Sequence, residues 1–86
     1  MDERTRELIA IGASVSAHCQ PCLDYHMREA WGLGIDEGDV REALEVGRMV
    51  ENGASTAMTR YADLLFTLAQ SEGIACCAGG NSERSA

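Results

Sequence analysis

The chain has 86 residues, and 14 acidic against 7 basic side chains give it a formal net charge of −7. So acidic a chain is a poor candidate for binding the phosphate backbone of a nucleic acid, and we expect no nucleic-acid partner. Hydrophobic residues make up 45% of the chain but aromatic residues only 5%, so the core must consist of aliphatic side chains. One domain of this size buries only about 60% of its unfolded surface, so association with other copies is expected.

The first residues of the chain argue against export. They are rich in acids, and the apolar run that follows at residues 8–17 is interrupted by Gly12, Ser14 and Ser16. This pattern is not typical of a signal peptide. No stretch approaches the roughly 20 apolar residues that a membrane-spanning helix needs. We therefore expect a cytoplasmic protein without membrane contact, where two close cysteines are more often catalytic or metal-binding than structural.

The first predicted helix covers residues 2–17, where Leu8, Ile11 and Val15 recur at intervals of three and four residues. Acidic residues near its start suit the positive end of the helix dipole. Its second half is largely glycine, alanine and serine, although Gly12 weakens a helix by on the order of 1 kcal/mol relative to alanine. We therefore expect another backbone to approach this half closely.

The second predicted helix runs from Pro21 to about Trp31, because proline is favoured in the first turn of a helix and glycines at 32 and 34 end it. A third helix begins after Asp36, whose side chain can cap it. It is predicted to end at Glu51-Asn52-Gly53. Its apolar stripe consists of Val40, Ala43, Leu44, Gly47 and Val50.

A fourth helix is predicted over residues 54–71, and its residues 64–69 are apolar on nearly every side. So wide an apolar surface on a helix of a small chain indicates a subunit interface. The sequence thus predicts an all-α fold, a compact oligomeric bundle of about four helices in one domain over residues 1–73. We expect residues 74–86, which include Cys76-Cys77, to form a flexible tail.

The stretch that carries chemistry is Cys19-Gln20-Pro21-Cys22, followed by His26. Two thiols at this spacing can close a disulfide, and a histidine four residues after the second cysteine lies one helical turn further along the same face. With Pro21 at the start of a helix, Cys22 falls in the first turn, where the dipole and free N–H groups stabilise a thiolate. Cys22 is therefore the predicted reactive sulfur, and Cys19 the resolving one.

The same residues allow other interpretations. Cys19, Cys22 and His26 can be three ligands of a zinc ion, which would make the protein a non-catalytic metal-binding module with its fourth ligand elsewhere. The two cysteines can also be small buried hydrophobes. Cys76-Cys77 can pair or pass electrons, but two thiols of a frayed terminus are the simpler interpretation. His18 is expected at the surface.

The chain resembles the alkylhydroperoxidase D-like core of the carboxymuconolactone decarboxylase family. The shared pattern is a glutamate twelve residues before the first cysteine, then Cys-x-x-Cys, then x-x-x-His. Here it consists of Glu7, Cys19-Gln20-Pro21-Cys22 and His26. The similarity continues through residues 7–13 and, less specifically, 43–50. Some members have a histidine between the cysteines, where this chain has Pro21.

The resemblance implies an all-helical fold that assembles into trimers or hexamers, and an antioxidant peroxidase or disulfide reductase activity. It implies that Cys22 is oxidised to a sulfenic acid, that Cys19 condenses with it to a disulfide, and that His26 and Glu7 form a proton relay. The expected partners are a peroxide or disulfide substrate and a thiol reductant protein, without a cofactor or a bound metal. The decarboxylase members do not rely on this cysteine pair, so its presence argues against lactone decarboxylation.

The position of Glu7 sets a geometric condition. If the chain from Glu7 to Cys19 formed one straight helix, its twelve residues would hold the two about 18 Å apart. Glu7 therefore reaches the site only if the chain reverses near Cys19, or if another subunit contributes it.

Overall fold

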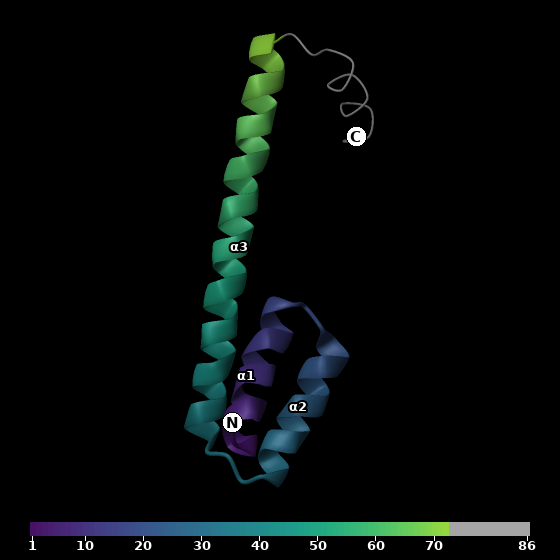
Figure 1. Cartoon of the computed structure of the whole chain (residues 1–86), viewed down its shortest axis with the longest axis vertical. Coiled ribbons are helices and arrows are strands. Elements are labelled where there is room, and N and C mark those ends of the chain that lie inside the picture. Colours follow the sequence, from purple (N-terminus) through teal and green to yellow (C-terminus); the bar gives the residue numbers. More distant parts are fainter. Residues whose placement is uncertain (73–86) are drawn as a thin grey trace. The chain divides into compact units, whose positions relative to one another are not determined.

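The computed structural model describes residues 1–72, and within them the secondary structure is helical, without strands. Three helices follow one another: α1 (Glu3–Ser16), α2 (Gln20–Gly32) and α3 (Glu37–Glu72) (Figure 1). The predicted all-α fold is confirmed for this part of the chain. The chain divides into two compact units, with the boundary between Ala54 and Ser55.

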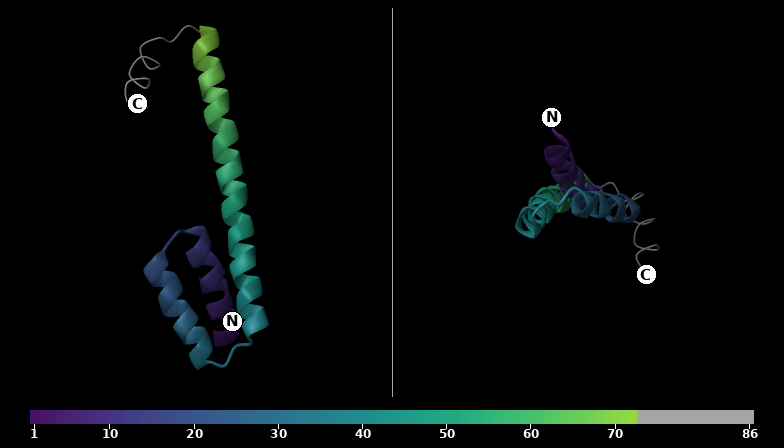
Figure 2. Two further views of the ribbon diagram at one scale, coloured as in Figure 1. Left: turned by 180° about the vertical axis from the view of Figure 1, so that it is seen from behind. Right: turned by 90° about the horizontal axis from the view of Figure 1, so that it is seen from below.

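In the unit Met1–Ala54, α1 and α2 form an antiparallel hairpin, and α1 lies between α2 and the first turns of α3 (Figure 2). The Asp2 carboxylate caps α1 by accepting a hydrogen bond from the Thr5 backbone N–H at 2.8 Å. Hydrogen bonding to Thr5 lowers the pKa of Asp2 below its ordinary value. Near the same end of α1, Arg4 forms an ion pair with Asp39 of α3.

The crossing of α1 and α3 depends on two glycines. A Cβ atom on Gly47 would lie 2.5 Å from the carbonyl oxygen of Gly12, a distance that leaves no room for a side chain. Across the same crossing, the Ser16 hydroxyl donates a hydrogen bond to the Gly47 carbonyl at 2.9 Å. The prediction that another backbone approaches the second half of α1 closely is therefore confirmed.

The core of this unit is small. Its buried hydrophobic residues are Ile11, Ala30, Ile35 and Val40. Partly buried side chains pack against them: Leu8, Leu23, Met27, Ala43 and Leu44. Most residues of the apolar stripes predicted on the first and third helices thus face the core, namely Leu8, Ile11, Val40, Ala43 and Leu44, whereas Val50 is 55% exposed. Val50 lies beyond the glycine crossing, where it lines an open groove instead.

α3 starts where the sequence predicts and continues where a break is predicted. The Asp36 carboxylate accepts a hydrogen bond from the Gly38 N–H at 2.9 Å, which confirms Asp36 as the cap. The helix then passes through Glu51-Asn52-Gly53 without ending, so the count of four helices is not confirmed. A single glycine weakens a helix by about 1 kcal/mol relative to alanine without ending it, and here no proline follows.

The second unit consists, as far as the structure describes it, of α3 from Ser55 to Glu72. No side chain from Ser55 to Ser71 is buried. Among the helices of residues 1–72, none is long and apolar enough to cross a membrane. The predicted domain end at residue 73, the tail of residues 74–86 and Cys76-Cys77 lie outside the described residues.

Candidate active site

The turn between α1 and α2 ends one helix and begins the next. His18 has a φ of 57°, the left-handed conformation that follows a helix end in a Schellman motif. Its N–H donates to the Val15 carbonyl at 3.1 Å, and the Cys19 N–H donates to the Ser14 carbonyl at 3.0 Å. Cys19 is at the same time the N-cap of α2. The chain therefore reverses at Cys19, which meets the geometric condition set by Glu7.

The two cysteines lie at the positive end of α2. Cys19 and Cys22 are joined by a disulfide, with their Cα atoms 5.2 Å apart. The Cys19 sulfur accepts a hydrogen bond from the Cys22 N–H at 3.3 Å, and Pro21 stands in the first turn as predicted. Cys22 is exposed whereas Cys19 is half-buried. An external oxidant or thiol therefore meets Cys22 first.

His26 and Glu7 contact each other directly within one chain. The His26 Nδ1 and Glu7 Oε1 atoms are 2.7 Å apart, and the two side chains are 28% and 14% exposed. An ionised carboxylate only accepts hydrogen bonds, so Nδ1 is the donor and Nε2 is left as the basic nitrogen of a neutral ring. Because His26 follows Cys22 by four residues on α2, both side chains lie on the same face, one turn apart.

Tyr25 is a neighbour of this pair that the sequence reasoning missed. Its ring stands edge-on to the His26 imidazole, with the ring centroids 5.0 Å apart, and the residue is 54% exposed. The Tyr25 ring therefore packs against the His26 imidazole on one side. An aromatic residue directly before the motif histidine was the available signal.

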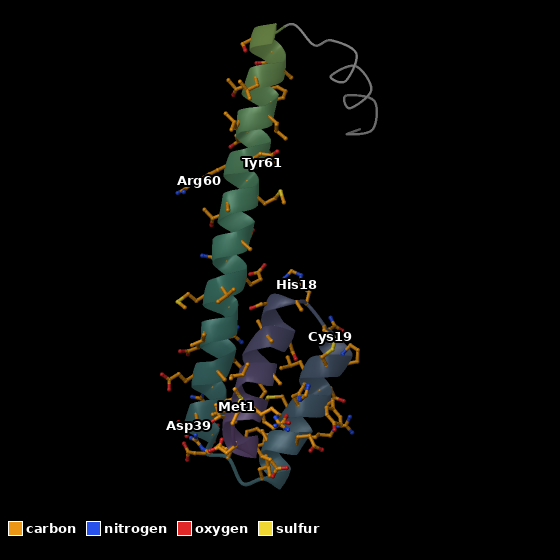
Figure 3. All side chains as sticks on the ribbon, viewed as in Figure 1. Met1, His18, Cys19, Asp39, Arg60 and Tyr61 are labelled. Carbon is orange, nitrogen blue, oxygen red and sulfur yellow. A yellow bond between two sulfur atoms is a disulfide. The ribbon has the colours of Figure 1, made fainter. Side chains whose placement is uncertain are left out.

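A second histidine–carboxylate pair stands at the same end of the hairpin. His18 Nε2 lies 3.1 Å from Glu51 Oε2 of α3, and both side chains are more exposed than Glu7 and His26. Figure 3 shows His18 and Cys19 together at the α1–α2 turn, far from Met1 and Asp39 at the other end. The surface position expected for His18 is confirmed, but Glu51 was not anticipated because 33 residues separate the two.

This arrangement has the parts of a two-electron thiol site. A disulfide that opens to a dithiol stores two electrons and two protons, and a carboxylate-oriented imidazole can carry one of those protons. Within residues 1–72, no three side chains of His, Cys, Asp or Glu converge as a metal site requires. The geometry thus supplies redox groups and an acid–base pair.

A comparison with known protein families finds a match for this chain. The model of the carboxymuconolactone decarboxylase family matches residues 1–64, so the chain belongs to this family. The matched range contains Glu7, both cysteines of the disulfide and His26. Searches among curated proteins and among solved structures returned no match to this chain.

Proposed function

We propose that this member of the carboxymuconolactone decarboxylase family is a thiol oxidoreductase that reduces peroxides or disulfides through Cys22 and Cys19. The observation that carries the proposal is the 2.7 Å contact between Glu7 and His26, one helical turn from an exposed Cys22 that pairs with Cys19. An exposed sulfur, a resolving cysteine and an oriented base are the groups that thiol-based reduction of a peroxide uses.

In the oxidative half of the proposed reaction, the Cys22 thiolate attacks one oxygen of a peroxide. The O–O bond breaks, the second oxygen leaves as water or an alcohol after taking up a proton, and Cys22 becomes a sulfenic acid. His26 takes the proton of the Cys22 thiol beforehand, and Glu7 stabilises the resulting imidazolium. The Cys19 thiol then attacks the sulfenic sulfur, which releases water and forms the disulfide.

In the reductive half, two thiols of a reductant protein restore the pair. The first thiolate attacks the disulfide to form a mixed disulfide, and the second releases it, so that the reductant leaves as a disulfide and the site as a dithiol. A substrate disulfide in place of the peroxide would oxidise Cys19 and Cys22 by the same exchange in reverse. The proposal therefore covers both classes of oxidant.

The test is a thiol count by mass spectrometry on reduced protein before and after one equivalent of hydrogen peroxide. Cys76 and Cys77 are first replaced by serine, so that only Cys19 and Cys22 are counted. We expect the loss of two thiols and a Cys19–Cys22 disulfide. Thiols that survive the peroxide unchanged, together with about one zinc per chain in the same sample, would replace the proposal by a metal-binding module.

Single substitutions then assign the two sulfurs. In Cys19→Ser, a sulfenic acid should persist on Cys22 and react with a dimedone probe, because the resolving thiol is gone. Cys22→Ser should lose peroxide turnover entirely. If Cys22→Ser retains turnover, or if the probe fails to label Cys19→Ser, the assignment of the two sulfurs is wrong.

A further inference from the structure

The disulfide lies at one end of an exposed stripe of α2. Cys22, Tyr25 and Glu29 follow one another at intervals of three and four residues, so they lie along the same side of the helix. All three are exposed, and we call them the α2 stripe. The opposite side of α2 packs in the core with Leu23, Met27 and Ala30. Because α2 stands at the edge of the unit Met1–Ala54, with α1 beside it, the stripe is open to a partner (Figure 2).

Exposure and hydrogen bonding decide which sulfur of the disulfide a reductant attacks. Cys22 is exposed, whereas Cys19 is half-buried as the N-cap of α2. The Cys19 sulfur accepts a hydrogen bond from the Cys22 N–H at 3.3 Å, which stabilises it as a leaving thiolate. The reductant sulfur therefore bonds to Cys22 as the bond between Cys22 and Cys19 breaks. The residues that flank the attacking cysteine then lie against the surface around Cys22.

Tyr25 is an apolar contact point one helical turn from Cys22. The residue is 54% exposed, and its ring stands edge-on to His26 with the ring centroids 5.0 Å apart. Because this contact restrains the ring, a partner that packs on its free side costs little further side-chain entropy. Tyrosines are among the residues that dominate the binding energy of protein interfaces. A small thiol that reaches only Cys22 gains nothing from this ring.

Glu29 gives the α2 stripe a negative charge. Asp24 and Arg28, which lie beside the stripe, neutralise each other as an ion pair at 2.8 Å. Within residues 1–72, Glu29 forms no ion pair. The chain as a whole has a net charge of −7, so its field attracts a basic partner and repels an acidic one. The charge that complements the stripe is therefore positive.

We propose that the α2 stripe is the docking surface for a dithiol reductant protein that carries an apolar and a basic residue beside its attacking cysteine. The proposal rests on the proposed function, because only a redox-active cysteine pair needs a reductant. Seven residues of helix place Glu29 about 10 Å from Cys22 along α2. In an extended segment of the partner, the basic residue therefore lies about three residues from the attacking cysteine. The partner's second thiol then releases Cys22, so the partner leaves as a disulfide and the chain as a dithiol.

The experiment measures how fast three dithiols reduce the disulfide of the full chain in which Cys76 and Cys77 are replaced by serine. One is dithiothreitol, which is small and uncharged. The others are two peptides with the same Leu-Cys-Gly-Pro-Cys segment, with lysine or glutamate three positions before the first cysteine. Alkylation of the free thiols and mass spectrometry give each rate. At low ionic strength the lysine peptide should be about five- to ten-fold faster than the glutamate peptide, and high salt should remove the difference.

Glu29→Gln tests the charge of the stripe. Glu45→Gln is its matched control, since it removes the same charge from an exposed position on α3, which α1 separates from α2. In Glu29→Gln the ratio of the two peptide rates should fall about five-fold, towards one, and in Glu45→Gln it should stay within about two-fold of the wild-type ratio. An equal fall in both variants, or no fall in Glu29→Gln, would overturn the docking of a basic partner.

Tyr25→Ala tests the apolar contact, and the dithiothreitol rate serves as the reference for any change in the disulfide itself. Both peptides should slow by about 10-fold relative to dithiothreitol. Tyr25→Phe should keep the wild-type ratio, because it keeps the ring. If Tyr25→Ala slows dithiothreitol as much as the peptides, the ring acts on the site and not on the partner, and the proposal is overturned.

The oxidant used to form the disulfide separates this proposal from the proposed function. Part of each sample is oxidised with one equivalent of hydrogen peroxide and part with diamide, which forms disulfides without a peroxide. A disulfide that forms with diamide alone would contradict peroxide reduction, and the docking rates would still be measured on it. A disulfide that forms with both oxidants, and whose reduction is indifferent to the stripe, would overturn the docking alone.

Discussion

The two histidine–glutamate pairs near the disulfide consist of the same residue types in different surroundings. His26 and Glu7 are 28% and 14% exposed, whereas His18 and Glu51 are 70% and 36% exposed. An exposed pair of this kind contributes about 0–1 kcal/mol and is screened by salt. Partial burial fixes the first pair in orientation, which is what proton transfer needs. Residue type alone therefore does not distinguish the two pairs, whereas burial does.

The largest difference between the pairs should appear on removal of each imidazole. His26→Gln should lower peroxide turnover by about 100- to 10,000-fold, the range typical for loss of a general base. His18→Gln, the matched control, should change it less than about two-fold, because an exposed surface pair contributes little. Steady-state turnover of both variants across pH 5–9 checks this. If both variants retain wild-type rates and pH profiles, the His26–Glu7 pair (the inner pair) has no role in turnover beyond that of the His18–Glu51 pair (the outer pair).

Removal of each carboxylate gives a smaller contrast. Glu7→Gln keeps the shape of the side chain but no longer stabilises an imidazolium, so we expect a loss of about 10- to 100-fold in turnover. Glu51→Gln should again stay within about two-fold. Steady-state turnover of both variants measures this contrast. Equal losses in the two variants would contradict the comparison.

Which contacts of the site the sequence could predict depends on how many residues separate the partners along the chain. Cys19, Cys22 and His26 lie within two helical turns, so their spacing alone indicated the site. The contact of Glu7 with His26 depended on the reversal at His18, and a left-handed histidine where glycine is usual gives no sequence signal. The contact between His18 and Glu51 depends on how α3 crosses α1. The spacing of apolar residues within one helix does not predict such a crossing. The predicted helix end at Glu51-Asn52-Gly53 is wrong because it was inferred from local residues alone. One glycine destabilises a helix only slightly, and α3 continues through it.

The glycine crossing provides a way to disturb the packing of α1 against α3, on which the contact between His18 and Glu51 depends. In Gly47→Ala the new Cβ meets the Gly12 carbonyl oxygen at 2.5 Å, so the helices must separate, at a loss of about 1–3 kcal/mol in the free energy of unfolding. Gly53→Ala is the control, since nothing lies within 4 Å of its Cβ position, and it should stabilise by about 0.5–1 kcal/mol. Urea unfolding measures both. An unchanged stability in Gly47→Ala would show that the crossing is not tight.

The smallest expected effect comes from His18→Gly. Glycine removes the ion pair with Glu51, worth about 0–1 kcal/mol at this exposure, but it also relieves the φ of 57°, which favours glycine by a similar amount. The two contributions should cancel to within about 0.5 kcal/mol in urea unfolding. His18→Ala removes the pair without relieving the backbone, so it should be the less stable variant, and its deficit should shrink in 1 M salt. If glycine is instead more destabilising than alanine, relief of the left-handed backbone at residue 18 does not contribute as expected, and this prediction is wrong.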